Sequence, residues 1–135
     1  MTRKLFGKKG QALVEFALIL PILILLLCAI LDFGWLIGNQ LLATYGCREG
    51  ARYGAVRVTS SDFENEVTTK VYDAMPVYTY DGLDITVERT NPSSPRDGDV
   101  IVSIDYSFRL LTPFSVLYFG DMDYTAQTEC TMKAE

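Results

Sequence analysis

The feature that most constrains this chain is a long apolar run near its N-terminus. Residues 16–31 contain no charged side chain, and Asp32 is the one charged residue between Phe16 and Ile37. As a helix with a rise of about 1.5 Å per residue, residues 16–37 would span roughly 33 Å, enough to cross a bilayer core. A buried helix of a soluble domain keeps a polar face, and this run has none. Pro21 lies inside the run, where a membrane helix tolerates it. We therefore expect one membrane-spanning helix.

Basic residues gather before the apolar run and not directly after it. Arg3, Lys4, Lys8 and Lys9 precede the run, whereas the next basic residue is Arg48. The positive-inside rule therefore predicts a cytoplasmic N-terminus, with the residues after about 38 on the other side of the membrane.

Three kinds of processing act on N-termini of this type. A secretory signal peptide needs small residues after the apolar run, and residues 32–36 offer no clean site. A lipoprotein signal would use Cys28, but the bulky Leu27 precedes it. A prepilin signal is cleaved after a glycine on the cytoplasmic side, and its apolar segment stays in the mature protein. Gly10 satisfies this third requirement.

The residues around Gly10 resemble the prepilin-peptidase site of type IV pilin-like proteins. Gln11 follows the glycine, and Glu15 and Phe16 stand where that family has an acidic and then an aromatic residue. The runs 10–21, 32–34 and 48–56 further resemble the TadE-like minor pilins, or pseudopilins, of the tight-adherence (Flp) pilus system. The resemblance is close over roughly the first 58 residues and covers the remainder only in general layout.

This resemblance implies how the chain is divided and processed. Residues 1–10 would be a leader removed by a prepilin peptidase, 11–58 a transmembrane and extended helix, and 59–135 an extracytoplasmic head on the bacterial cytoplasmic membrane. In pilins, the glutamate equivalent to Glu15 is thought to pair with the N-terminal amine of a neighbouring subunit. Cleavage after Gly10 would create such an amine at Gln11. Because intramembrane acids are costly and usually functional, cleavage and Glu15 explain each other.

Small residues recur at a spacing of four along the expected helix, which we extend over 39–58. Each glycine weakens a helix by about 1 kcal/mol, so five of them need a reason. Small residues four apart let two helix backbones approach closely. We expect this stripe to pack in a filament or against a partner's helix; a frayed helix end or a turn is the alternative. Its glycines are Gly34, Gly38, Gly46, Gly50 and Gly54.

The charged residues near the C-terminal end of this helix have two interpretations. Glu49 can reach Arg52 three residues on, and Arg48 lies four residues before Arg52. These residues either form a solvated surface group or contact lipid headgroups or an acidic neighbouring subunit. Asp32 is expected near the outer interface as an interfacial or helix-packing residue, without a chemical role.

The three cysteines divide between the membrane and the exported part. Cys28 is expected to pack in the membrane as a small apolar residue. Cys47 and Cys130 fall outside it, where disulfides form. They either pair with each other or remain two buried thiols, because pairing requires a proximity that the sequence does not reveal.

The rest of the chain predicts one small α+β head of pilin-like type. Ser61 and Glu64 form a capping-box pattern before an amphipathic helix over 62–74, which Pro76 would end. Alternating apolar residues predict three strands of an antiparallel sheet with one buried face. The expected strands are 83–88, 100–108 and 124–131. The apolar segment 110–119 either folds back as a short helix under the sheet, our default, or forms an exposed patch for another subunit.

No pattern of catalytic or metal-binding residues is present in the sequence. The chain has no histidine, no Cys-x-x-Cys and no glycine-rich phosphate loop. We therefore expect neither enzymatic activity nor a cofactor or metal. The net charge is −5, and removal of the basic leader would make the mature chain more acidic still. This charge argues against nucleic acid as a partner.

The predicted function is that of a minor pilin or pseudopilin that takes part in assembly of a pilus for adhesion or secretion. Its partners would be the prepilin peptidase, other pilin subunits, assembly-platform proteins and the lipid bilayer. The alternative is an uncleaved single-pass membrane anchor that carries an extracellular binding module. In that case Glu15 would have no amine to meet.

Overall fold

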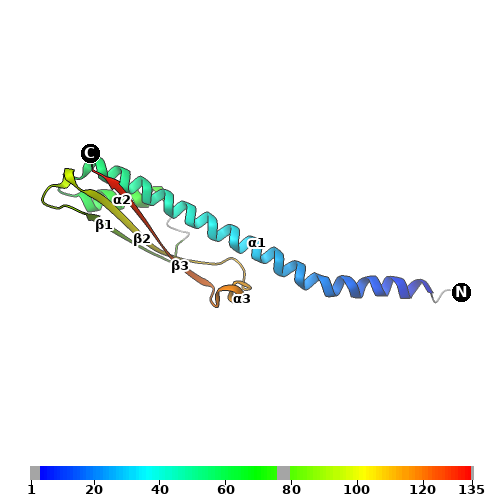
Figure 1. Cartoon of the computed structure of the whole chain (residues 1–135). Coiled ribbons are helices and arrows are strands. Elements are labelled where there is room, and N and C mark those ends of the chain that lie inside the picture. Colours follow the sequence, from blue (N-terminus) through cyan, green and yellow to red (C-terminus); the bar gives the residue numbers. More distant parts are fainter. Residues whose placement is uncertain (1–3, 76–79, 135) are drawn as a thin grey trace.

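A single long helix, α1, runs from Lys4 to Arg57 and carries the rest of the chain along its C-terminal half (Figure 1). The structure is a computed structural model that describes residues 4–75 and 80–134, with the backbone alone for 4–9, Pro95 and Tyr118. The end of α1 falls next to the boundary at residue 58 that the sequence indicated.

The head consists of short helices and one antiparallel sheet. The strands follow one another in the order β1-β2-β3, so β2 is central, and Ile104 of β2 lies between Ile85 of β1 and Thr128 of β3. This arrangement confirms the predicted α+β fold and its three strands. The elements after α1 are α2 (Phe63–Ala74), β1 (Gly82–Arg89), the 3-10 turn η2 (Pro95–Asp97), β2 (Asp99–Arg109), α3 (Ser115–Phe119) and β3 (Asp123–Lys133).

The N-terminal half of α1 stands clear of the head. Within the described residues, α1 is the one helix that is long and apolar enough to cross a membrane, and none of its most apolar window is buried. Apolar side chains such as Leu18 and Ile22 are about 70% exposed. A water-soluble fold could not leave such a surface uncovered, so the helix anchors the protein in a membrane by a single pass.

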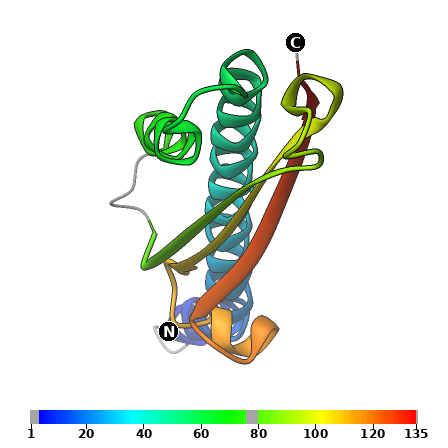
Figure 2. The ribbon, with the colours of Figure 1, turned by 90° about the vertical axis from the view of Figure 1, so that its left-hand side faces the viewer.

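The core of the head forms where α1 meets α2 and the inner face of the sheet. Figure 2 shows α2 and β3 on opposite sides of α1. Small residues of α1 are buried there, including Ala43, Cys47 and Ala51, and they allow a close approach. The inner face of β2 supplies the larger side chains, whereas the outer face of the sheet carries exposed polar residues such as Asp84 and Gln127. The buried β2 residues are Val100, Val102, Ile104, Tyr106 and Phe108.

Helix α2 forms as predicted, but its predicted cap is wrong. Its apolar stripe is buried, and the helix begins after Asp62 as N-cap, without a side-chain capping bond. Ser60, not Ser61, provides the local hydroxyl: its Oγ donates to Glu66 at 3.0 Å and accepts the N–H of Asp62 at 3.4 Å. The tight turn after α1, where the N–H of Ser60 bonds the carbonyl of Arg57 at 2.9 Å, brings this residue into place. Pro76 lies outside the described residues.

The apolar segment 110–119 does form a short helix, α3, but it does not pack under the sheet. Leu111, Phe114, Val116 and Leu117 are exposed. Leu110 turns into the core instead. The default of core packing is therefore wrong for most of this segment, because α3 lies beyond the end of the sheet nearest the N-terminal half of α1 (Figure 1).

Candidate functional site

The segment with the predicted processing and assembly residues lies at the exposed start of α1. Gly10, Gln11, Glu15 and Phe16 all have exposed side chains or surfaces. The side-chain amide of Gln11 donates to Oε1 of Glu15 at 3.1 Å, one helical turn away. Among the described residues this is the one hydrogen-bond partner that Glu15 has. Because the carboxylate is exposed, it can accept a further donor.

The second acid of α1, Asp32, is in a different situation. Its side chain is 1% exposed. The backbone N–H of Thr112 donates to its Oδ1 at 2.9 Å, and the hydroxyl of Thr112 donates to its Oδ2. Both oxygens of the carboxylate are thus satisfied by one residue of the head. This contact explains how an acid is tolerated at the end of an apolar run.

Further contacts next to Asp32 join α1 to the membrane-facing end of the head. The indole N–H of Trp35 donates to the carbonyl of Arg109 at 3.2 Å, at the end of β2. One turn higher, the hydroxyl of Tyr80 donates to the carbonyl of Asn39 at 3.1 Å. Burial raises the pKa of Tyr80 to about 12, so it remains a donor at neutral pH. We call the contacts of Asp32, Trp35 and Asn39 with the head the junction.

The junction was not predicted from the sequence. Asp32 was recognised only as an interfacial or packing residue, and its partner Thr112 lies 80 residues further along the chain. A lone acid at the edge of an apolar run signals that some partner exists. The identity of that partner depends on where β2 ends, which local patterns do not specify.

The glycine stripe serves two different surfaces. Gly46, Gly50 and Gly54 are buried against α2 and β2 of the same chain. A Cβ at Gly50 would collide with Cγ2 of Val71, and one at Gly54 would lie 3.0 Å from Cγ1 of Val100. The close helix approach is therefore made with α2 of this chain, and not with a partner's helix as the sequence suggested. Gly34 and Gly38 have nothing within 4 Å and stay open.

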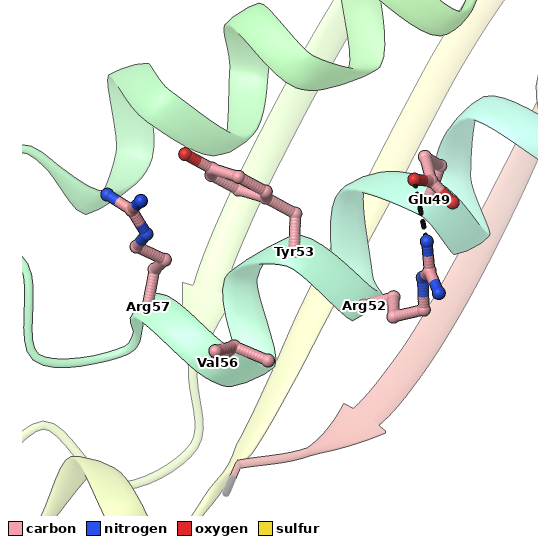
Figure 3. A pocket seen from close by; sticks show the side chains of 5 residues that line it. All are labelled: Glu49, Arg52, Tyr53, Val56 and Arg57. Atoms are coloured by element: carbon pink, nitrogen blue, oxygen red, sulfur yellow. Dashed lines mark hydrogen bonds and ion pairs between the residues drawn. The ribbon is translucent and has the colours of Figure 1, made fainter.

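The charged group near the top of α1 lines a shallow hollow (Figure 3). Arg52 Nη2 lies 3.0 Å from Oε1 of Glu49, and the Arg52 side chain is 71% exposed. On the other side of the hollow, Arg57 lies over the ring of Tyr53 at 5.4 Å and 3.5 Å from Oε2 of Glu66. The hollow is lined by Glu49, Arg52, Tyr53, Val56 and Arg57.

The distance of Arg48 and Arg52 from the membrane limits what these residues can contact. Arg48 lies 16 residues above Asp32, which corresponds to about 24 Å along a helix. Lipid headgroups extend only some 5–8 Å beyond the hydrocarbon core. If Asp32 is near the outer interface, Arg48 and Arg52 are too high for headgroups, and an acidic neighbouring subunit is the better of the two functional alternatives.

The structure brings Cys47 and Cys130 together across the core. Both thiols are free. The Cys47 thiol donates to the carbonyl of Val102 at 3.1 Å. The pKa of the Cys47 thiol is raised above its ordinary value. Burial is the larger cause, and hydrogen bonding with the Cys130 thiol is the next. The two cysteines therefore lie close enough to interact, but the raised pKa keeps the Cys47 thiol in its protonated, unreactive form. A disulfide between Cys47 and Cys130 stays a prediction.

Comparison with known proteins supports the resemblance described above over the N-terminal part of the chain. Residues 10–52 match the family described as TadE-like protein. The matched region contains the exposed Gly10–Phe16 segment, the membrane span, the α1 side of the junction and the Arg48–Arg52 group. It ends within α1 and does not include the head. No curated protein and no solved structure matches the chain significantly.

Proposed function

We propose that this chain, whose residues 10–52 match the TadE-like family, is a minor pilin or pseudopilin of a Tad (Flp) pilus. The family match itself associates the chain with this pilus system and with the membrane. In our proposal a prepilin peptidase removes residues 1–10. The N-terminus is cytoplasmic, the head is extracytoplasmic, and the protein contributes to assembly without catalysing a reaction.

One observation carries this proposal: the exposed acid at the start of an uncovered membrane helix. Among the side chains that the structure describes, Glu15 is bound only by the neutral amide of Gln11, at 3.1 Å. Cleavage after Gly10 would convert the backbone nitrogen of Gln11 into an ammonium group. An ammonium from a neighbouring subunit would bind Glu15 more strongly than the amide does, because both partners are charged and the surroundings have a low dielectric constant.

The upper part of α1 supports a second contact in the same assembly. Arg48 and Arg52 are exposed, and the hollow lined by Arg52 and Arg57 also includes the exposed Val56 (Figure 3). An acidic and partly apolar surface of another pilin subunit or of a platform protein would complement this group. The Glu49–Arg52 pair is too exposed to contribute much to folding, which leaves it available for such a contact.

The assembly role is tested by Glu15→Gln in a host that carries the matching pilus genes. The variant should reach the membrane and lose its leader normally, but its incorporation with other pilus components should fall by about tenfold or more, because a charge-assisted bond becomes neutral. Glu64→Gln, which changes an exposed acid of the head, is the matched control and should behave as wild type. Normal assembly by Glu15→Gln would refute this use of Glu15.

A further inference from the structure

A second apolar surface lies at the foot of the head, separate from the span itself. Residues 110–119, which we call the foot loop, contain no charged side chain. Leu111 is 55% exposed, Phe114 39% and Leu117 72%. Three large apolar side chains on one short segment are unusual for a surface that faces only water.

The foot loop is held at a defined height on α1. Thr112 is bound to Asp32 through its backbone N–H and its hydroxyl, and Arg109, just before the loop, accepts a bond from Trp35. At the other end of the loop, the rings of Phe119 and Phe33 meet edge to face, with centroids 5.9 Å apart. The loop is therefore fixed at the level of residues 32–35.

That level coincides with the outer boundary of the membrane. A hydrocarbon core about 30 Å thick takes up roughly 20 residues of helix. If the core begins between Gln11 and Glu15, it ends between Leu31 and Trp35. Tilting of α1 would move this boundary further up the helix and immerse the loop more deeply. Trp35 is also the residue type that concentrates at membrane interfaces.

The backbone of the foot loop suits a lipid environment, where unpaired N–H groups are costly. The N–H of Leu110 bonds the carbonyl of Met122 at 2.8 Å, and that of Ser115 bonds Thr112 at 3.2 Å. The N–H of Leu117 bonds the carbonyl of Phe114 at 2.9 Å, and that of Gly120, directly after the loop, bonds the carbonyl of Val116 at 3.0 Å. These N–H groups, together with that of Thr112, are thus paired within the protein, while the apolar side chains are exposed.

We propose that the foot loop inserts into the outer leaflet of the bilayer, with Leu111, Phe114, Val116 and Leu117 in contact with the acyl chains. The loop continues the lipid-facing surface of α1 through the Phe33–Phe119 contact, and it has no charge that would oppose insertion. The head is then seated on the membrane at two points, the span and the loop. This proposal rests on membrane anchoring by α1 and not on cleavage or pilus assembly.

The test measures how deeply position 117 lies in the membrane. The full-length chain, with Cys28, Cys47 and Cys130 replaced by alanine, receives one spin label at Leu117→Cys and is diluted into phosphatidylethanolamine–phosphatidylglycerol vesicles. Collision of the label with oxygen, which concentrates in lipid, is compared with collision with a water-soluble nickel complex. Leu23→Cys calibrates the bilayer, and Ser93→Cys, in the β1–β2 connection at the far end of the head, calibrates water (Figure 1).

We expect oxygen collisions to predominate at position 117, as at 23, and nickel collisions to predominate at 93. A nickel accessibility at 117 equal to that at 93 would overturn the proposal. Protection of 117 from both reagents would also overturn it, in favour of contact with another protein surface. Val116→Cys repeats the measurement if the first variant is poorly folded. The vesicles contain no peptidase or pilus component, so failure here leaves the proposed function untouched.

Discussion

At the scale of single residues, the two acids at the edges of the membrane span have opposite situations. Glu15 is exposed and holds one amide of its own helix, whereas Asp32 is buried with both oxygens bound by Thr112. The first carboxylate is available to another molecule, and the second is committed within the chain. Our proposal therefore assigns assembly to Glu15, whereas the contacts of Asp32 position the head.

The contribution of the Asp32–Thr112 hydrogen bonds to stability can be measured by changing Thr112. Thr112→Val keeps the backbone N–H but leaves one carboxylate oxygen of Asp32 without a donor in a buried position. We expect the folded head to lose about 1–3 kcal/mol, seen as a lower midpoint of thermal unfolding of the full chain in detergent micelles. Thr125→Val, on the exposed face of β3, is the matched control. Equal effects of the two substitutions would show that the bond from the Thr112 hydroxyl to Asp32 contributes nothing to stability.

The buried Tyr80 predicts how stability responds to alkaline pH. Burial raises its pKa to about 12 in the folded chain, from an ordinary value of about 10. The fold favours the neutral phenol, so this contribution is complete below pH 10 and is lost as the pH rises through 12. The midpoint of denaturant unfolding in micelles should fall over this range. Tyr80→Phe should show a shallower fall, and an unchanged pH dependence in that variant would contradict the assignment.

At the scale of elements, α1 performs two tasks along one continuous helix. Its N-terminal half presents large apolar side chains to lipid, and its C-terminal half presents glycine and alanine to α2 and the sheet. The change from large to small residues marks the change from lipid to protein as the neighbour. The buried glycines therefore belong to the folding of the head, and of the five glycines in the stripe Gly34 and Gly38 remain open for a second helix.

Two glycine substitutions separate these tasks. Gly50→Ala should destabilise the head by about 1–2 kcal/mol, since the collision with Val71 outweighs the better helix propensity of alanine. Gly34→Ala, where a Cβ meets nothing within 4 Å, should leave the unfolding midpoint at or slightly above that of wild type. The comparison uses thermal unfolding of both full-length variants in the same detergent. Equal midpoints would show that α2 does not need a glycine at position 50.

The elements were largely predictable from the sequence, while their contacts were not. The strands and α2 follow from periods of two and of about four residues, and the span follows from the length of its apolar run; all of these are local properties. Three features depend instead on how distant segments meet. They are the partner of the glycine stripe, the hydrogen bonds between Asp32 and Thr112, and the exposure of most of residues 110–119. The cap of α2 was missed for a similar reason, because the turn after α1 brings Ser60 and not Ser61 to the helix start.

At the scale of the whole molecule, the head is tied to α1 at two heights. The junction holds it at residues 32–39, and the shared core holds it from Ala43 to Val58. The head and the upper half of α1 therefore move together, so a force that draws α1 out of the membrane would lift the head directly. Under the proposed function, this coupling would transmit a force applied to the helix in the membrane to the head outside it.

The central claim, that this is a pilin-like subunit processed before assembly, is tested most directly by its N-terminus. The chain is extracted from membranes of a host that carries the pilus genes, and its N-terminal residue and intact mass are determined. We expect the chain to begin at Gln11, Gly10→Ala to retain the leader, and the control Gly7→Ala to be cleaved. An intact leader on the wild-type chain, in cells where the peptidase processes another pilin, would contradict the claim and leave an uncleaved membrane anchor.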